Sequence, residues 1–266
     1  MTLGGSRGST TSVGPTFAGR SGPLGETQRI VTRPSLRPLG NSAILVGVSD
    51  LVDQETAATT LELAKSIRTA LGVAAHDVVP AYNSVLVRFD PITTSATRQM
   101  ALVSEAVDQV AIDFGAQRGN GESAPRHITL GVCFGGPSGL DFEQTAHDLG
   151  MRERRMRDLF CQPAYRVAFL GFLAGFPYLL GLPDAFATVG RRGSPRPRVP
   201  AGSVAIAAGQ CGVYPRVASG GWRLLGLTAA TLFDIAREPL ALLQPGDYVR
   251  FEPVERLADA RADIDR

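Results

Sequence analysis

The chain has 266 residues, of which 44% are hydrophobic and 20% are charged, a balance typical of a globular protein with a sizeable core. Its net charge of +2 is too close to zero to indicate a protein that binds nucleic acid or anionic membranes, and no apolar run reaches the roughly 18 residues of a membrane span. The 3 cysteines and 3 histidines lack CxxC, HxxxH or HExxH spacing, so the sequence predicts neither a disulfide framework nor a metal site. This cysteine usage fits a reducing cytoplasm.

Residues 1–37 are rich in Gly, Ser and Thr and lack the apolar core of a signal peptide, so we expect a disordered tail. The next segment, residues 38–134, alternates β-branched apolar runs with stretches of helical periodicity. This order of strand, helix, strand, strand, helix and strand predicts a ferredoxin-like domain, a split-βαβ unit. The expected elements are a strand at 43–48, a helix at 53–71, strands at 77–79 and 84–89, a helix at 94–114 and a strand at 127–133.

The second half, residues 135–266, begins with two short helices, expected at 140–149 and 152–160. Short apolar strands separated by Gly and Pro follow, and such spacing predicts a closed or nearly closed β-barrel. The fold class is therefore α+β, with an α/β domain followed by a barrel domain. The clearest strands are expected at 165–172, 203–209, 212–216, 222–228 and 247–254.

A loop rich in arginine and proline precedes the strand at 203–209. Guanidinium groups on a stiff backbone can hold carboxylates or phosphates, so Arg196 and Arg198 are candidate anion contacts. The alternative is a solvated basic loop whose arginines pair with nearby acids, and on residue type alone this is the commoner case. Asp141, at the start of the first short helix, is expected to act as an N-cap or first-turn acid.

Gln210 and Tyr214 flank Gly212 in a predicted turn, where they either present polar groups to a pocket or satisfy loop backbone. Trp222 is the only tryptophan and is either a core residue or a stacking platform. The chain has no GxxxxGK[ST] phosphate loop, and residues 38–266 contain no GxSxG nucleophile motif. The residues alone therefore do not predict a standard ATPase or serine hydrolase.

Four stretches together resemble a known family: GFLAGFPYLLGLP, PRPRVPAGSVAIAAGQCGVYP, SGGWRLLGLT and PGDYVRF. The family includes the B-type subunit of bacterial ATP-dependent 5-oxoprolinase, the first subunit of allophanate hydrolase and the sporulation-kinase inhibitor. It is also similar to carboxyltransferase subdomains C and D of urea carboxylase. The resemblance covers about residues 38–254.

The resemblance implies an N-terminal α/β domain followed by a cyclophilin-like β-barrel. It also implies a cytoplasmic hydrolase subunit that acts with a subunit-C-like barrel partner and a third subunit to convert 5-oxo-L-proline to L-glutamate with ATP. ATP would bind together with the partner subunit. The site residues we predict are Arg196 and Arg198 for an anionic group, Gln210 and Tyr214 for polar orientation, and Phe176, Pro177 and Trp222 for the pocket walls.

A second hypothesis is a non-catalytic regulator that binds a protein partner such as a sensor histidine kinase. Family members commonly carry Thr and Pro where this chain has Leu173 and Ala174, a His within the segment Leu159 to Cys161, and an Arg at Leu227. These differences remove exchangeable protons and a charge. The hypothesis predicts an exposed apolar patch on the barrel.

Overall fold

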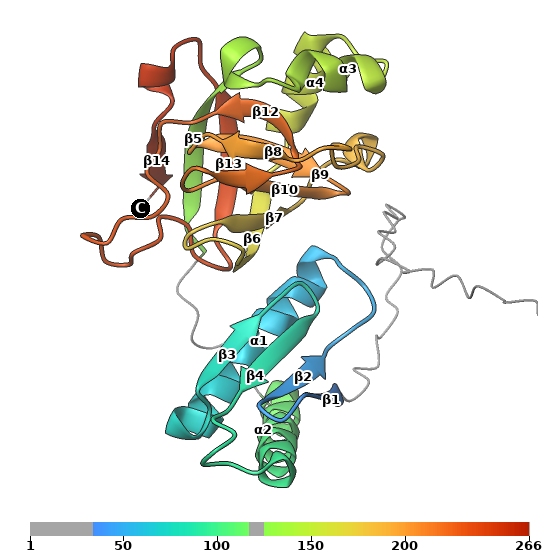
Figure 1. Cartoon of the computed structure of the whole chain (residues 1–266), viewed down its shortest axis with the longest axis vertical. Helices are drawn as coiled ribbons and strands as arrows, with labels where there is room; N and C mark the ends of the chain where they lie inside the picture. Colours follow the sequence, from blue (N-terminus) through green and yellow to red (C-terminus); the bar gives the residue numbers. More distant parts are fainter. Residues whose placement is uncertain (1–33, 117–124, 266) are drawn as a thin grey trace, which may run out of the picture.

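The computed structural model describes residues 34–116 and 125–265, with only the backbone described for 110–116 and for 265. The chain forms two units, an α/β unit and a larger β-barrel (Figure 1). The predicted tail lies almost wholly outside the described residues, which begin close to the first strand.

The α/β unit is a four-stranded antiparallel sheet in the order β1-β2-β4-β3, and both helices contact it. One apolar core lies between the sheet and the helices, formed by alternate strand residues such as Ile44, Val46, Val85 and Val87. The elements are β1 (Ser35–Leu39), β2 (Ala43–Gly47), α1 (Gln54–Leu71), β3 (Asp77–Pro80), β4 (Ser84–Arg88) and α2 (Ala96–Ala116).

Helix α1 begins and ends where the sequence predicts. The side chain of Asp53 accepts a hydrogen bond from Thr56 N at 2.7 Å, which satisfies a backbone donor of the first turn. At the other end, Gly72 has φ +50°, a conformation that a residue with a Cβ rarely adopts. These two residues confirm the predicted helix at 53–71.

The predicted assignment of the strand at 127–133 to the α/β unit is wrong. The segment predicted as that strand is β5 (His127–Phe134), which pairs with β12, β13 and β14 of the barrel. The edge of the sheet beside β2 is instead occupied by β1, which the sequence pattern did not reveal. A division of the chain ahead of β5, rather than after residue 134, keeps every strand with its partners, and the ferredoxin-like description is not confirmed.

The predicted closed barrel is confirmed. Seven strands follow one another in the order β12-β9-β10-β7-β6-β13-β5, and the pairing of β12 with β5 closes the ring. Only β5 and β13 among these pairs run parallel. The strands not yet bounded are β6 (Tyr165–Leu170), β7 (Pro177–Leu180), β9 (Ser203–Ala207), β10 (Gln210–Val213), β12 (Arg223–Leu227) and β13 (Tyr248–Pro253).

Smaller elements cover the barrel. A two-stranded ribbon joins β8 (Arg196–Val199) to β11 (Ala218–Gly220), and β14 (Ala262–Asp265) pairs with β5. Helices α3 (Phe142–Asp148) and α4 (Glu153–Cys161) confirm the predicted helical pair and lie at the end of the barrel away from the α/β unit (Figure 1). Short 3-10 turns are η1 (Gly72–Ala74), η2 (Gly136–Ser138), η3 (Asp184–Phe186) and η4 (Leu257–Asp259).

The two faces of the barrel wall carry different cores because side chains alternate along each strand. On β9, Val204 and Ile206 belong to the large interior core, whereas Ala205 and Ala207 belong to a separate cluster on the outer face. The interior of the barrel is therefore packed, and the outer face of β7, β10, β9 and β12 carries a second buried apolar cluster.

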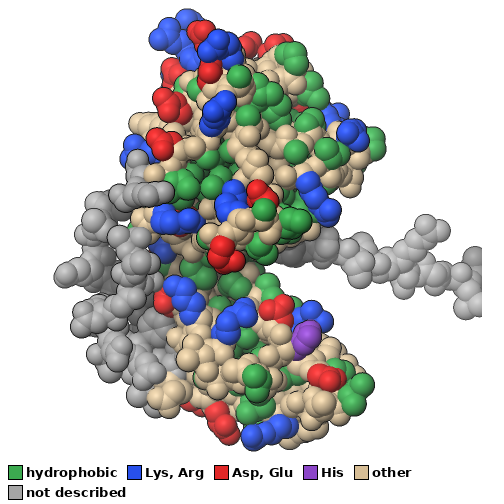
Figure 2. Space-filling view, turned by 90° about the vertical axis from the view of Figure 1, so that its left-hand side faces the viewer, with side chains coloured by type: hydrophobic (Ala, Val, Ile, Leu, Met, Phe, Trp, Pro, Cys, Tyr) green, Lys and Arg blue, Asp and Glu red, His purple; other side chains and the backbone are tan. Residues whose placement is uncertain are grey.

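The units meet through α1 and the outer face of β6 and β7. Ala57 of α1 packs with Ala168 and Leu180, and Tyr82 lies edge-on to Phe169 with ring centroids 4.8 Å apart. Figure 2 shows the units as two lobes, with acidic and basic side chains interspersed over the face it draws. The charge pattern of this face gives no large patch of one sign.

Candidate functional site

Aromatic side chains gather on the outer face of β7 and β10. Tyr178 of β7 pairs with Gly212 of β10, so the two residues face the same side, and Tyr214 lies two residues further along the chain. Phe176, which precedes β7, is 1% exposed and forms the centre of the group. Its ring centroid lies 5.1 Å from Tyr178, 5.2 Å from Tyr214 and 5.7 Å from Trp222.

Two glycines make this packing possible. A Cβ on Gly212 would lie 2.7 Å from Cε1 of Phe176, so only glycine lets that ring approach β10 this closely. A Cβ on Gly220 would lie 2.2 Å from the hydroxyl oxygen of Tyr214, which therefore rests against the β8-β11 ribbon. The Gly-rich sequences around both positions thus allow close approach of rings to backbone.

Phe172 forms the exposed rim of the cluster. It has φ +63°, unusual for a residue with a bulky side chain, and it is 60% exposed. Its ring is perpendicular to that of Phe176, with centroids 5.5 Å apart. The turn is closed by hydrogen bonds from Phe176 N to Leu173 O at 2.9 Å and from Gly171 N to Phe176 O at 3.1 Å. Backbone strain beneath an exposed ring is a feature found at functional sites.

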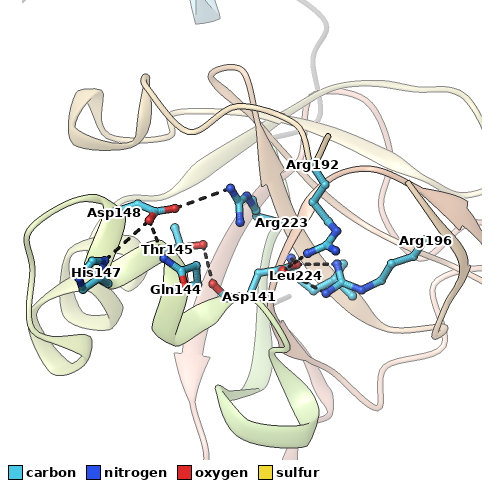
Figure 3. A network of polar contacts seen from close by, with 9 residues as sticks. All are labelled: Asp141, Gln144, Thr145, His147, Asp148, Arg192, Arg196, Arg223 and Leu224. Carbon is cyan, nitrogen blue, oxygen red and sulfur yellow. Dashed lines mark hydrogen bonds and ion pairs between the residues drawn. The ribbon is translucent and has the colours of Figure 1, made fainter. Parts of the chain in front are cut away.

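A buried carboxylate holds the arginine loop to the same side of the barrel. Asp141 has a 3% exposed side chain and pairs with Arg196 through two contacts, at 2.7 and 3.0 Å. Arg192 Nη1 donates to Asp141 Oδ1 at 2.7 Å, and Leu224 N donates to Oδ2 at 2.8 Å. Figure 3 shows both guanidinium groups converging on this carboxylate. We call Asp141, Arg192 and Arg196 the arginine clamp.

The arginine clamp fixes the charge of Asp141. Burial acts to raise its pKa, but the hydrogen bonds from Arg196 and Leu224 N and the charges of both arginines outweigh burial and hold the pKa below its usual value. The residue stands at the N-cap position of α3, as predicted, but its side chain does not cap the helix. The predicted capping role is therefore wrong, because the arginines and β12 take up the carboxylate oxygens.

A second ion pair extends this network. Arg223 Nη2 lies 3.6 Å from Asp148 Oδ2, and Gln144 donates to the other oxygen of Asp148 at 2.7 Å. The side chain of Asp148 is 46% exposed, unlike that of Asp141. This pair therefore continues the polar contacts between α3 and β12 toward solvent, as Figure 3 shows.

The structure brings together some of the predicted site residues and separates others. Phe176, Tyr214 and Trp222 form one cluster on the outer face. Arg196 is committed to Asp141, and Arg198 is exposed on β8. These placements match the sequence alternative in which loop arginines pair with acids.

Two further predicted residues lie on β10 and β7. Gln210 begins β10 and is half-buried, so the predicted turn around Gly212 is wrong. The turn is formed by Ala208 and Gly209, whose φ angles of +48° and +72° suit a two-residue hairpin between β9 and β10. Pro177 is buried and alternates with Tyr178, so it faces the other side of β7.

Sequence patterns did not single out Tyr82, or Asp141 as a partner of the arginines. Asp141 and Arg196 are 55 residues apart, and no local spacing indicates such a pair. Tyr82 comes from the α/β unit, and its ring lies 6.0 Å from that of Tyr178. The one signal in the sequence was the basic loop itself, for which pairing with nearby acids was one of the two alternatives.

Other classes of site find no support in the described ranges 34–116 and 125–265. These residues contain no cluster of three or more His, Cys, Asp or Glu side chains placed to hold a metal ion. None of the helices described is both long and apolar enough to cross a membrane. We take the outer aromatic face with its neighbouring arginines as the candidate site, because Phe176, Tyr214 and Trp222 lie together there.

Comparisons with known proteins agree with this architecture. The family described as "Carboxyltransferase domain, subdomain C and D" matches residues 34–243. The B subunit of the 5-oxoprolinase of Bacillus subtilis (strain 168) is 31% identical over 232 residues, which cover 84% of this chain and 93% of that protein. The corresponding 5-oxoprolinase B subunit of Escherichia coli O157:H7 is 47% identical over 132 residues, which cover 50% of this chain and 60% of that protein.

The solved structure of TTHA0988 has a similar fold, with a TM-score of 0.67 and 31% sequence identity. The match covers 81% of this chain but 40% of that longer chain. Together with the E. coli match, this means that some relatives extend well beyond the matched region. The family match spans both structural units and most of the described residues, so the chain belongs to the family of the carboxyltransferase domain, subdomains C and D.

Proposed function

We propose that this chain is the B-type subunit of an ATP-dependent complex that hydrolyses 5-oxo-L-proline to L-glutamate. The observation that carries the proposal is the likeness to the 5-oxoprolinase B subunit of B. subtilis, which extends over 93% of that protein. The name of that relative implies further subunits. Activity is therefore expected of the assembled complex with a subunit-C-like barrel partner and a third subunit.

The chemistry explains why ATP is needed. A lactam carbonyl is a poor electrophile, because nitrogen donates electrons to it. Transfer of the terminal phosphoryl group of ATP to the carbonyl oxygen creates a good leaving group. Water can then attack the carbonyl carbon, and the ring C–N bond of the tetrahedral intermediate breaks as the nitrogen takes up a proton. The resulting acyl phosphate is hydrolysed by a second water to L-glutamate and phosphate. We propose that ATP binds together with the partner subunits.

The outer aromatic face supports a substrate-binding role. Phe176 and Trp222 form its buried apolar base, Phe172 is its exposed rim, and Tyr214 places a hydroxyl beside them. A small ring with polar substituents is bound well by such a mixture of apolar walls and few polar groups. We keep Arg198 and Gln210, which lie near this face on β8 and β10, as predicted substrate contacts.

The test is reconstitution. The chain is co-expressed with the partner subunits from its own genome, and ATP-dependent release of glutamate from 5-oxo-L-proline is measured. An established 5-oxoprolinase complex run in parallel validates the assay, and omission of ATP gives the background. The proposal predicts release that needs both ATP and this chain. A folded, assembled complex without release would refute it.

A second candidate function is a non-catalytic regulator that binds a sensor histidine kinase. The exposed ring of Phe172 favours it, because this hypothesis predicts an apolar patch on the barrel. The two functions differ in what Phe172→Ala changes. If the chain is a regulator, Phe172→Ala should weaken its binding to the kinase, and the parent complex should show no lactam hydrolysis. If the chain is an enzyme subunit, the parent complex should hydrolyse the lactam, and the effect of Phe172→Ala is measured as a change in that rate.

A further inference from the structure

Two phenols, those of Tyr178 and Tyr214, belong to the aromatic cluster, and the exposed Arg191 begins the loop beside it. The rings of Tyr178 and Tyr214 both contact Phe176, at 5.1 and 5.2 Å. Burial raises the pKa of each phenol, and the charge of Arg191 opposes the rise in both. Both hydroxyl groups therefore stay protonated and able to donate at neutral pH. A Cβ on Gly220 would lie 2.2 Å from the hydroxyl oxygen of Tyr214, and Arg192 N donates to Gly221 O, so the start of the arginine loop lies beside this hydroxyl.

The hydrogen-bonding capacity of these three groups is not used within the protein as far as the structure describes it. Across residues 34–116 and 125–265, no hydrogen bond or ion pair engages the hydroxyls of Tyr178 and Tyr214 or the side chain of Arg191. The neighbouring arginines differ, because Arg192 and Arg196 are both held by Asp141. Arg191 is thus a loop arginine beside the aromatic cluster whose charge remains available.

The arginine clamp explains why Arg191 is presented at this place. Arg192 is fixed by its bond to Asp141, and its backbone N–H donates to Gly221 O at 2.8 Å. Arg191 immediately precedes this anchored residue, so the start of the loop is held next to the glycines that lead to Trp222. A flexible side chain on a fixed backbone loses less freedom when it binds a ligand.

We propose that Arg191, Tyr178 and Tyr214 bind the carboxylate of a small ring-shaped acid, whose ring packs against the aromatic cluster. A guanidinium can hold both carboxylate oxygens, and the phenols can donate to the remaining lone pairs. The exposed ring of Phe172 and the half-buried ring of Tyr178 supply the apolar surface, and the buried rings of Phe176 and Trp222 pack beneath them. The identity of the acid as 5-oxo-L-proline rests on the proposed function.

Trp222 provides a probe of this site. It is the only tryptophan of the chain, and its ring lies 5.9 Å from Tyr178 and 5.7 Å from Phe176. Its emission should respond to a ligand on the cluster. The full chain is titrated with 5-oxo-L-proline, with cyclopentanecarboxylate, which lacks the lactam, and with 2-pyrrolidinone, which lacks the carboxylate.

The proposal predicts a saturable change with both acids and none with 2-pyrrolidinone at the same concentrations. Arg191→Ala should weaken binding of the acids about tenfold or more, because a charge-assisted contact is lost. The matched control is Arg250→Ala, which removes an exposed arginine of β13 and should leave binding unchanged. Tyr178→Phe should weaken binding, whereas Tyr82→Phe, which removes a hydroxyl buried out of reach of a ligand, should not.

The outcomes separate this inference from the proposed function. If cyclopentanecarboxylate binds through Arg191 but 5-oxo-L-proline does not, the carboxylate site stands and the proposed substrate is wrong. If the assembled complex hydrolyses 5-oxo-L-proline with the same KM in Arg191→Ala as in the parent, the site is overturned and the proposed function stands. An absence of any response to both acids, by Trp222 emission and by calorimetry on the complex, also overturns the site.

Discussion

Arg196 Nη1 donates a hydrogen bond of 2.7 Å to Asp141 Oδ2, although the two residues are 55 positions apart in the chain. The same oxygen accepts from Leu224 N at 2.8 Å. One carboxylate therefore ties β8 and β12 to the start of α3. Arg192 adds a third segment, the loop ahead of β8.

Removing this carboxylate should destabilise the barrel. Asp141→Ala leaves Arg196, which is 17% exposed, without its counter-charge and leaves Leu224 N without an acceptor. Loss of one partner of a buried ion pair costs about 3 kcal/mol or more. We expect a loss of this order in the free energy of unfolding, measured by urea denaturation with Trp222 emission.

The matched control is Asp158→Ala. Asp158 pairs with Arg154 on α4, but the two side chains are 57% and 87% exposed. Such a surface pair contributes about 0.5 kcal/mol or less. If Asp141→Ala and Asp158→Ala lower the free energy of unfolding by the same amount, the structural role given to the arginine clamp is contradicted.

The arginine clamp should also give the protein an acid-sensitive component of stability. The pKa of Asp141 is lowered on folding from its ordinary value of 3.8, because the arginines and Leu224 N outweigh the effect of burial. A carboxyl with a lowered pKa stabilises the fold above its unfolded pKa, and this contribution is lost as the pH falls through the folded pKa.

The free energy of unfolding of the parent should therefore exceed that of Asp141→Asn by a constant amount from neutral pH down to about pH 5. This difference should shrink below about pH 4. Urea midpoints measured for both proteins across this range provide the check. An advantage that persisted unchanged at the lowest pH would show that charge does not hold the arginine clamp together.

Local patterns predicted the local features of this fold. Helix α1 followed from Asp53, Gly72 and the apolar spacing between them, and the barrel followed from short strands separated by turn residues. The assignment of β5 failed because an isolated apolar strand carries no information about which sheet it joins. The ion pair of Asp141 with Arg196 was missed for the same reason, since it depends on tertiary packing.

The grouping of three aromatic residues was predicted, whereas their role in binding stays a prediction. Phe176, Tyr214 and Trp222 were expected to lie together and do so. Arginines of one loop look alike in a sequence, and their different roles follow only from the position of Asp141. The turn at Ala208 and Gly209 was missed because alanine with a positive φ is uncommon, whereas the glycine of β10 resembled a turn residue.

Gly212→Ala should disrupt the aromatic cluster. The new methyl group would lie 2.7 Å from two atoms of the Phe176 ring and 2.9 Å from Pro177 O. Because Pro177 O belongs to the backbone of β7, it cannot move away without distorting the strand. We expect a loss of about 1–3 kcal/mol in unfolding free energy together with a shift of Trp222 emission. Gly193→Ala meets nothing within 4 Å and is the control that should leave both unchanged.

Tyr82→Phe should stabilise the chain without ligand. The hydroxyl of Tyr82 is buried without a hydrogen-bond partner in the described part of the chain, and burial raises its pKa far above the ordinary value. Removing an unsatisfied buried hydroxyl should raise the free energy of unfolding by about 1 kcal/mol. Tyr165→Phe is the opposite case, because that hydroxyl donates to Phe160 O at 2.8 Å, and its loss should cost about 1 kcal/mol. Equal effects of the two substitutions would contradict this prediction.

Phe172 should be held in its strained conformation at a cost in stability. Its φ of +63° is unfavourable for any residue with a Cβ, and its 60% exposed ring buries little surface. Phe172→Ala and Phe172→Gly both remove the ring, but only glycine relieves the backbone. We expect the glycine variant to be more stable than the alanine variant by about 0.5–1 kcal/mol, after allowance for the extra freedom of glycine in the unfolded chain. Thermal and urea unfolding of the two proteins measure this difference. If the alanine variant is as stable as the glycine variant, the backbone at this position is not strained, and the exposed ring needs no functional explanation.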